Sequence, residues 1–166
     1  MKMLAFVASI LLIQHYNFAQ EKTEVVNASQ LIDINEIYQA KGVIFSESVH
    51  YFGKDALNKE RFTPSIAEVR ITEKITLNSY LFNKENNNSK YSARNVEIIM
   101  NYYRQYFGYL ESDGSKIIVI YFMNVKDKPL LFQDWEKVCV VGFGDEYYKN
   151  SDIMWINITK NERIFR

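Results

Sequence analysis

The sequence that decides the fold is residues 104–110 (RQYFGYL), a turn carrying Asp113-Gly114, and residues 116–123 (KIIVIYFM). Asp-Gly accepts the positive φ that tight hairpin turns require, and β-branched residues favour a strand directly after it. The second segment is apolar at both alternating positions, which is typical of a strand covered on both faces. We therefore predict a β-hairpin whose second strand lies in the centre of a sheet.

Further strands are predicted on both sides of this hairpin. Residues 136–143 and 152–159 have strand composition and are joined by a turn at Gly144-Asp145. Residues 43–45 and 49–52 are shorter β-prone clusters in the first half of the chain. The strands joined by short turns therefore concentrate in the second half.

Helices are predicted mainly in the first half. Apolar residues recur at helical spacing over 31–38, before a stop at Lys41-Gly42, and again over 96–107 after Asn95, ending before Gly108. The clearest helix start is Thr63-Pro64-Ser65, where Thr63 can cap, Pro64 suits the first helical position, and Ser65 with Glu68 has the spacing of a capping box. We predict a helix over 64–82.

The segment 66–82 also fits a strand. The apolar residues that share one alternating parity would form a strand face: Val69, Ile71, Ile75, Leu77 and Leu81. With helices in the first half and strands in the second, we expect an α+β fold. It would be a mostly antiparallel sheet of about four or five strands with one or two helices packed on one face.

Several of these pieces together resemble a known group of proteins. Residues 62–65 (FTPS), 103–109 (YRQYFGY), Asp113-Gly114 with its isoleucine-rich strand, and 135–137 (WEK) follow one another in the same order. Over roughly residues 62–160 the chain resembles a family of small, exported, uncharacterised proteins of Gram-negative bacteria. The resemblance implies no activity and no catalytic residues, and it favours the helix after Pro64.

The first residues have the layout of a signal peptide. Lys2 precedes an apolar run, polar residues follow it, and a small residue, Ala19, stands at the expected cleavage site. We expect residues 1–19 to be removed and residues 20–166 to form a single α+β domain with a loose N-terminal lead-in. The predicted location is the periplasm or the extracellular space. The apolar run is too short to cross a membrane, and the one cysteine, Cys139, is too far along the chain to carry a lipid anchor.

The composition argues against several functions. The formal net charge of +0 gives no general attraction to nucleic acid or to anionic membrane. After removal of the signal peptide the chain keeps one histidine, His50, and one cysteine, Cys139. One of each is too few for a zinc site, and the pair gives only weak support for a nucleophilic cysteine activated by a histidine. The sequence has no phosphate-binding glycine loop, no dinucleotide-binding motif and no Gly-x-Ser-x-Gly nucleophile elbow of a hydrolase. We expect no metal and no cofactor.

The strongest candidate for binding is the aromatic and basic stretch 102–109. In a strand, Tyr103, Gln105, Phe107 and Tyr109 would share one face, while Arg104 and Tyr106 would share the other. Exposed tyrosines offer a large contact area with a polar tip to a sugar ring or a partner protein. The alternative is that these residues pack against a helix and across strands.

We therefore take Arg104, Tyr106, Tyr109 and His50 as candidate ligand-binding residues. The leading hypothesis is an exported, non-enzymatic binding or interaction domain for a protein or glycan ligand. Two alternatives stay open: a hydrolase that uses paired carboxylates, and a periplasmic inhibitor or immunity-type protein. The sequence leaves the oligomeric state open.

Overall fold

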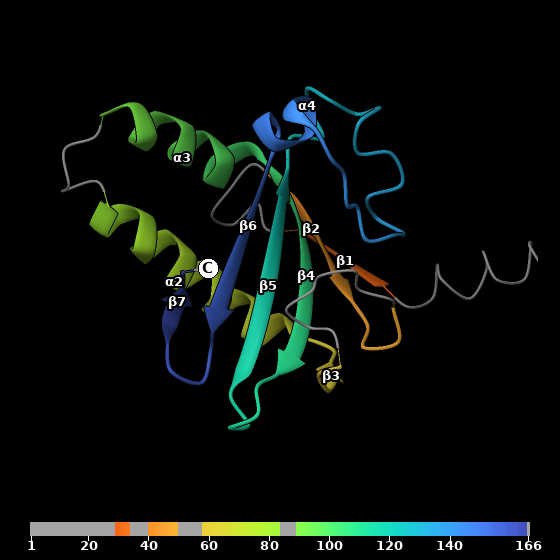
Figure 1. Cartoon of the computed structure of the whole chain (residues 1–166), viewed down its shortest axis with the longest axis vertical. Coiled ribbons are helices and arrows are strands. Elements are labelled where there is room, and N and C mark those ends of the chain that lie inside the picture. Colours follow the sequence, from red (N-terminus) through yellow and green to blue (C-terminus); the bar gives the residue numbers. More distant parts are fainter. Residues whose placement is uncertain (1–28, 34–39, 50–57, 84–88, 166) are drawn as a thin grey trace, which may run out of the picture.

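A computed structural model describes residues 29–33, 40–49, 58–83 and 89–165 of the chain. These residues form an α+β fold with one mixed, seven-stranded sheet (Figure 1). The predicted fold class is confirmed, although the sheet has more strands than the four or five expected. Its order is β1-β2-β4-β5-β6-β7, with β3 paired to β4. Of the described strand pairs only β2 and β4 run parallel.

The elements have the following bounds. The strands are β1 Ser29–Asp33, β2 Lys41–Phe45, β3 Arg61–Phe62, β4 Tyr103–Leu110, β5 Lys116–Met123, β6 Ser151–Asn157 and β7 Glu162–Ile164. The helices are α2 Ile66–Asn83, α3 Ser89–Asn101 and α4 Asp145–Lys149.

The predicted hairpin is confirmed as β4 and β5, which pair from Tyr103↔Met123 to Leu110↔Lys116. Its turn uses Gly114 at φ 79°, and the Ser115 amide donates to Asp113 Oδ1 at 2.9 Å. Strand β5 lies between β4 and β6 and is buried along almost its whole length. Residues 116–123 are therefore apolar at both alternating positions because both faces of β5 are buried, as predicted.

The helix predicted after Pro64 is confirmed as α2. Ser65 and Glu68 form a capping box, since the Ser65 amide donates to Glu68 Oε2 at 2.9 Å and the Glu68 amide donates to Ser65 Oγ at 3.2 Å. Val69 and Ile75 are buried while Ile71 is exposed, so the alternating parity did not mark a strand face.

Two predicted helical segments differ from the structure. Residues 31–33 belong to β1 and pair antiparallel with β2, so a helix there is wrong; residues 34–38 lie outside the described residues. Pairing with a neighbouring strand outweighs a weak helical pattern over so few residues. Helix α3 begins at Ser89, so Asn95 is inside the helix and is not its cap, and the helix ends at Asn101 before β4.

The strand predicted over 136–143 is also wrong, because this segment forms turns and irregular backbone. The buried side-chain amide of Gln105 hydrogen-bonds to backbone groups of this region, as a neighbouring strand would. Its Nε2 donates to the carbonyls of Trp135 (2.6 Å) and Val138 (2.7 Å), and its Oε1 accepts from the Val140 amide (3.1 Å). These three backbone groups are thus satisfied without a strand partner. The following strand, β6, agrees with the prediction.

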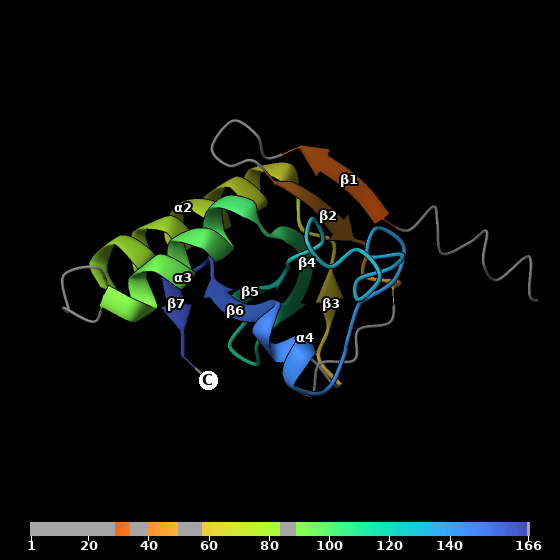
Figure 2. The same cartoon turned by 90° about the horizontal axis from the view of Figure 1, so that it is seen from above.

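The sheet is covered on both faces. Helices α2 and α3 lie side by side on one face, and the segment 124–150 lies over the other (Figure 2). The helix-covered face packs Ile44, Tyr106, Ile118, Ile120, Phe122 and Met154 against Val69, Ile75 and Ile98. The opposite face packs Phe45, Phe107, Val119 and Tyr121 against Phe132, Trp135 and Tyr147.

Candidate functional site

Three of the four residues proposed from sequence as ligand-binding are part of the core. Arg104, Tyr106 and Tyr109 are each 0% exposed. Arg104 and Tyr106 face the helices and Tyr109 faces the opposite side, as the strand alternation predicts, so the structure does not bring the three together in one cleft. His50 lies outside the described residues. Because the three buried side chains have no surface for a ligand, we locate the candidate site elsewhere.

Arg104 instead connects β4 to both long helices. Its Nε donates to Glu73 Oε1 on α2 at 3.1 Å, and its two Nη atoms donate to the carbonyls of Tyr102 and Ile99 at the end of α3. The Tyr106 hydroxyl donates to the same Glu73 oxygen at 2.7 Å. This buried network fixes the helices on the sheet.

A pocket of about 510 Å³ lies at the end of the sheet where β6 begins. It is bounded by α3, the loop 141–143, α4 and the first residues of β6. Its apolar and aromatic lining includes Ile98, Tyr121, Phe143, Tyr147, Tyr148 and Ile153. Its charged lining residues are Arg94 and Asp152. The size is within the usual range of small-molecule sites.

The pocket lies beside the part of β6 that β7 does not reach. Strand β7 pairs only with the last three residues of β6, from Trp155 to Asn157. The earlier part of β6 therefore has no strand along its outer edge among the described residues. There the Ile153 amide bonds to Asp152 Oδ1 at 2.8 Å in place of a strand partner. A sheet edge left open in this way is where backbone and side chains remain accessible.

Helix α4 is held over the pocket by several contacts. The Tyr147 hydroxyl donates to the Val140 carbonyl at 3.2 Å, and Ser151 Oγ donates to the Tyr147 carbonyl at 2.8 Å. A Cβ at Gly142 would lie 2.3 Å from Tyr147 Cδ2, so the loop requires glycine where this ring packs. From α3, Arg94 Nη2 donates to the Tyr148 carbonyl at 3.1 Å. Hydrogen bonds thus connect the loop, α4, α3 and β6, which together line the pocket.

The two charges of the pocket are close enough to influence each other but form no ion pair. Burial raises the pKa of the Asp152 carboxyl, and the Ile153 amide, Arg163 and Arg94 oppose this shift. Among the described residues, the Arg94 side chain donates to the backbone carbonyls of Tyr148 and Lys149 and not to Asp152. A negative and a positive group therefore face one apolar space, each with hydrogen-bonding capacity left.

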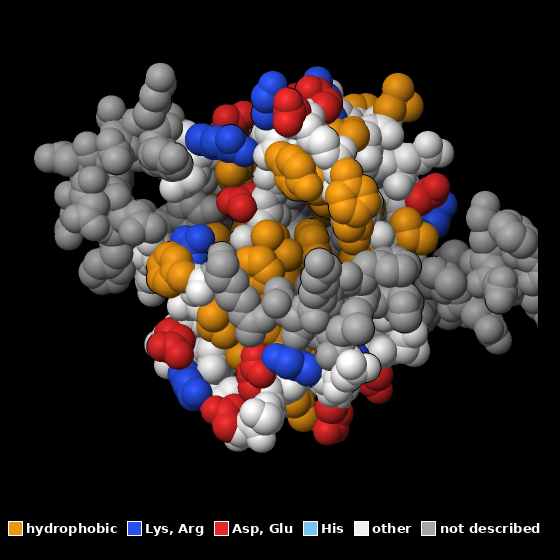
Figure 3. All heavy atoms as spheres, viewed as in Figure 1, with side chains coloured by type: hydrophobic (Ala, Val, Ile, Leu, Met, Phe, Trp, Pro, Cys, Tyr) orange, Lys and Arg blue, Asp and Glu red, His pale blue; other side chains and the backbone are white. Residues whose placement is uncertain are grey.

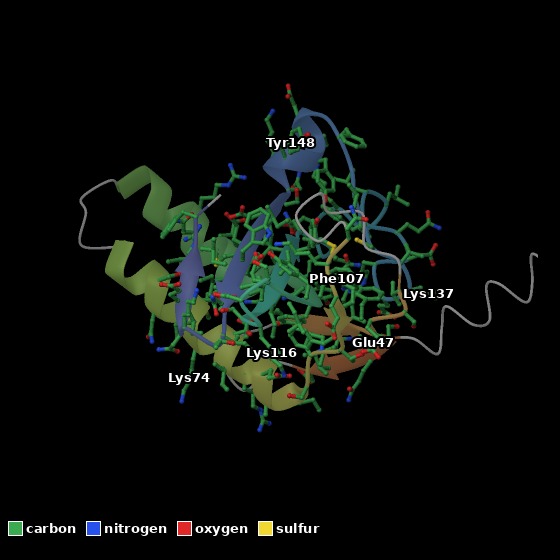
Figure 4. The ribbon with its side chains drawn as sticks, turned by 60° about the horizontal axis from the view of Figure 1, so that its bottom comes forward. Glu47, Lys74, Phe107, Lys116, Lys137 and Tyr148 are labelled. Carbon is green, nitrogen blue, oxygen red and sulfur yellow. The ribbon has the colours of Figure 1, made fainter. Side chains whose placement is uncertain are left out.

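Aromatic side chains are exposed around the entrance. Phe143 is 85% exposed and Tyr148 is 58% exposed. Figure 3 shows hydrophobic side chains gathered in the middle of this face, below α4. In Figure 4, Tyr148 extends from α4 at one end of the molecule, whereas Phe107 lies within the packed sheet. Exposed aromatic side chains beside a pocket offer a large apolar contact area to a ligand.

Other chemistry finds little support in the part of the chain that the structure describes. No three His, Cys, Asp or Glu side chains gather there as a metal site would require. Cys139 lies in the loop and not in a strand, half-buried against the core. Among the described residues no helix is both long and apolar enough to cross a bilayer.

Sequence reasoning missed this site because its parts are far apart in the chain. Arg94 was not singled out, and Phe143 was placed inside a predicted strand. The only local signal is the density of aromatic residues near Gly144, with Phe143 before it and Tyr147-Tyr148 after it.

Comparison with known proteins adds no assignment: no family model matches the chain, and neither a curated protein nor a solved structure matches it.

Proposed function

We propose that this protein is an exported, non-enzymatic binding protein that holds a small ligand with a large apolar part in the pocket beside β6. The observation that carries the proposal is the pocket itself: a partly open hollow of about 510 Å³ with an aromatic lining and few charges. Sites that bind small molecules are generally concave and apolar, with a few polar groups that orient the ligand.

The neighbouring contacts support a preformed site. Tyr147 is buried and is bonded at its hydroxyl to Val140, and Arg94 ties α3 to α4. Walls held in this way lose little conformational freedom when a ligand enters, which favours binding. Phe143 and Tyr148 are exposed, and a bound ligand would remove part of their apolar surface from water.

The hydrolase hypothesis receives less support from this pocket. A glycoside hydrolase places two carboxyl groups on either side of the scissile bond. Asp152 is the one acidic side chain in the described lining of the pocket. The inhibitor hypothesis requires a protein partner, and no feature of the pocket favours one.

Fluorescence of 8-anilinonaphthalene-1-sulfonate tests the proposed binding. We expect saturable enhancement by the folded protein, and a reduction of affinity of at least about fivefold in Tyr148→Ser and Phe143→Ser, since each removes a large apolar contact. Phe165→Ser is the matched control, because Phe165 is 75% exposed and does not line the pocket. Equal binding by all three variants, or no saturable binding, would overturn the proposal.

Export is tested separately. Expression in a Gram-negative host, followed by fractionation and mass measurement, should give a chain that begins near Gln20 in the periplasm or the medium. Recovery of the uncleaved chain in the cytoplasm would contradict this part of the proposal.

A further inference from the structure

The pocket carries two opposite charges that do not neutralise each other. Arg94 comes from α3 and Asp152 from β6, and both line the same apolar space. Among the ion pairs of the described residues, none joins the Arg94 guanidinium to the Asp152 carboxylate within 4.0 Å. Opposite charges left apart in a partly apolar site are each available to a ligand group of the other sign.

Each charged group is oriented by other contacts. The Ile153 amide donates to Asp152 Oδ1, which fixes the carboxylate at the open edge of β6. Arg94 Nη2 donates to the carbonyls of Tyr148 and Lys149, which fixes the guanidinium beside the last turn of α4. A guanidinium has five N–H donors, so donors remain for a carboxylate. Both groups are thus preorganised.

We propose that the ligand is a small zwitterion with a large apolar side chain, such as an amino acid or a dipeptide. Its ammonium group would bind Asp152, its carboxylate would bind Arg94, and its apolar side chain would lie against Tyr148, Phe143 and Ile98. This inference rests on the proposed function and adds the chemical class of the ligand. Burial of Asp152, which raises the pKa of its carboxyl, is consistent with a group that gains from a cationic partner.

Calorimetric titration with four probes tests the ligand class. The probes are L-phenylalanine, phenethylamine, which has no carboxylate, 3-phenylpropanoate, which has no ammonium, and L-phenylalanyl-L-phenylalanine. We expect at least one zwitterion to bind about tenfold more tightly than both single-charge probes, because each charge-assisted hydrogen bond contributes about that factor. The relative affinities of L-phenylalanine and the dipeptide identify which of the two sources fits.

Variants assign the two charges. In Asp152→Asn the zwitterion and 3-phenylpropanoate should bind equally, and in Arg94→Gln the zwitterion and phenethylamine should bind equally. Asp145→Asn and Arg70→Gln are the matched controls, since both change a charge outside the pocket and should keep the tenfold preference. Circular dichroism confirms that each variant is folded before titration.

The two proposals fail in different ways. If the zwitterions bind no better than the single-charge probes, or do not bind at all, the inferred ligand class is wrong. The proposed function still stands in that case if 8-anilinonaphthalene-1-sulfonate binds and Tyr148→Ser weakens it. If that probe does not bind saturably either, both proposals are overturned.

Discussion

Arg104 Nε donates to Glu73 Oε1 at 3.1 Å between β4 and α2, and the two side chains are 0% and 3% exposed. Removing one partner of a buried ion pair leaves a charge in a medium that solvates it poorly. We expect Glu73→Gln to lower the free energy of unfolding by about 3 kcal/mol in urea denaturation. Glu97→Gln changes an exposed acid on α3 and should cost less than about 0.5 kcal/mol. Equal effects of the two substitutions would show that the buried pair does not stabilise the fold.

Gln105 makes the second buried polar connection, because its amide bonds to three backbone groups of the segment 135–140. Gln105→Leu leaves those groups without this partner, and each such loss costs about 1–3 kcal/mol. We expect a loss of at least about 3 kcal/mol, together with faster hydrogen exchange at the Val140 amide. Gln133→Leu, at an exposed position just before this segment, is the control. Unchanged exchange at Val140 in the first variant would contradict the assigned role.

Gly108 lies opposite Phe62 where β3 pairs with β4, and a Cβ at this position would lie 2.5 Å from the Phe62 carbonyl oxygen. Gly108→Ala must push β3 away, and we expect a loss of about 3 kcal/mol in thermal or urea unfolding. Gly114→Ala meets no atom within 4 Å but keeps an unfavourable φ of 79°, so it should cost about 1 kcal/mol. If Gly108→Ala cost no more than Gly114→Ala, β3 would not lie against β4 as described.

Asp152 provides a pH-dependent test. Because burial raises the pKa of its carboxyl in the folded protein, the folded state binds the proton more tightly than the unfolded state. The free energy of unfolding therefore falls as the pH rises from the unfolded value, 3.8, through the higher folded pKa. Asp152→Asn removes this titration but keeps an acceptor for the Ile153 amide.

The expected result is that Asp152→Asn becomes progressively more stable than the parent protein across that interval and stays so at neutral pH. The free energy of unfolding of both proteins between pH 3 and 7 is the measurement. A variant that gains stability and loses affinity for a zwitterion would have the pattern expected of a residue kept for binding. A pH-independent difference between the two proteins would contradict the assignment of the titration to Asp152.

The parts of the fold that sequence predicted are those set by local chemistry. The capping box at Ser65 and Glu68, the turn glycine at Gly114 and the isoleucine-rich strand β5 each carry their cause in adjacent residues. The strand alternation of β4 was predicted correctly as well. The sequence did not predict that both faces of β4 are buried, because alternation shows which residues share a face but not what covers that face.

The remaining elements depend on contacts between distant residues. Residues 31–33 form a strand because β2 lies beside them, and the segment 136–143 leaves the sheet because Gln105 bonds to its backbone. The candidate pocket is lined by three separate segments and lies beside the part of β6 that β7 does not reach. No pattern within one segment shows which distant segments meet. The sequence therefore predicted a site at the aromatic residues of β4, which are buried.

The proposal that the pocket beside β6 binds a ligand is tested most directly by nuclear magnetic resonance. Two-dimensional ¹H–¹⁵N spectra of the labelled protein, recorded during titration with 8-anilinonaphthalene-1-sulfonate, follow the backbone amides individually. We predict saturable shifts at Val141, Tyr148 and Ile153, which line the pocket. Shifts confined to exposed apolar residues elsewhere, such as Leu130 and Phe165, or the absence of any saturable shift, would contradict the proposal.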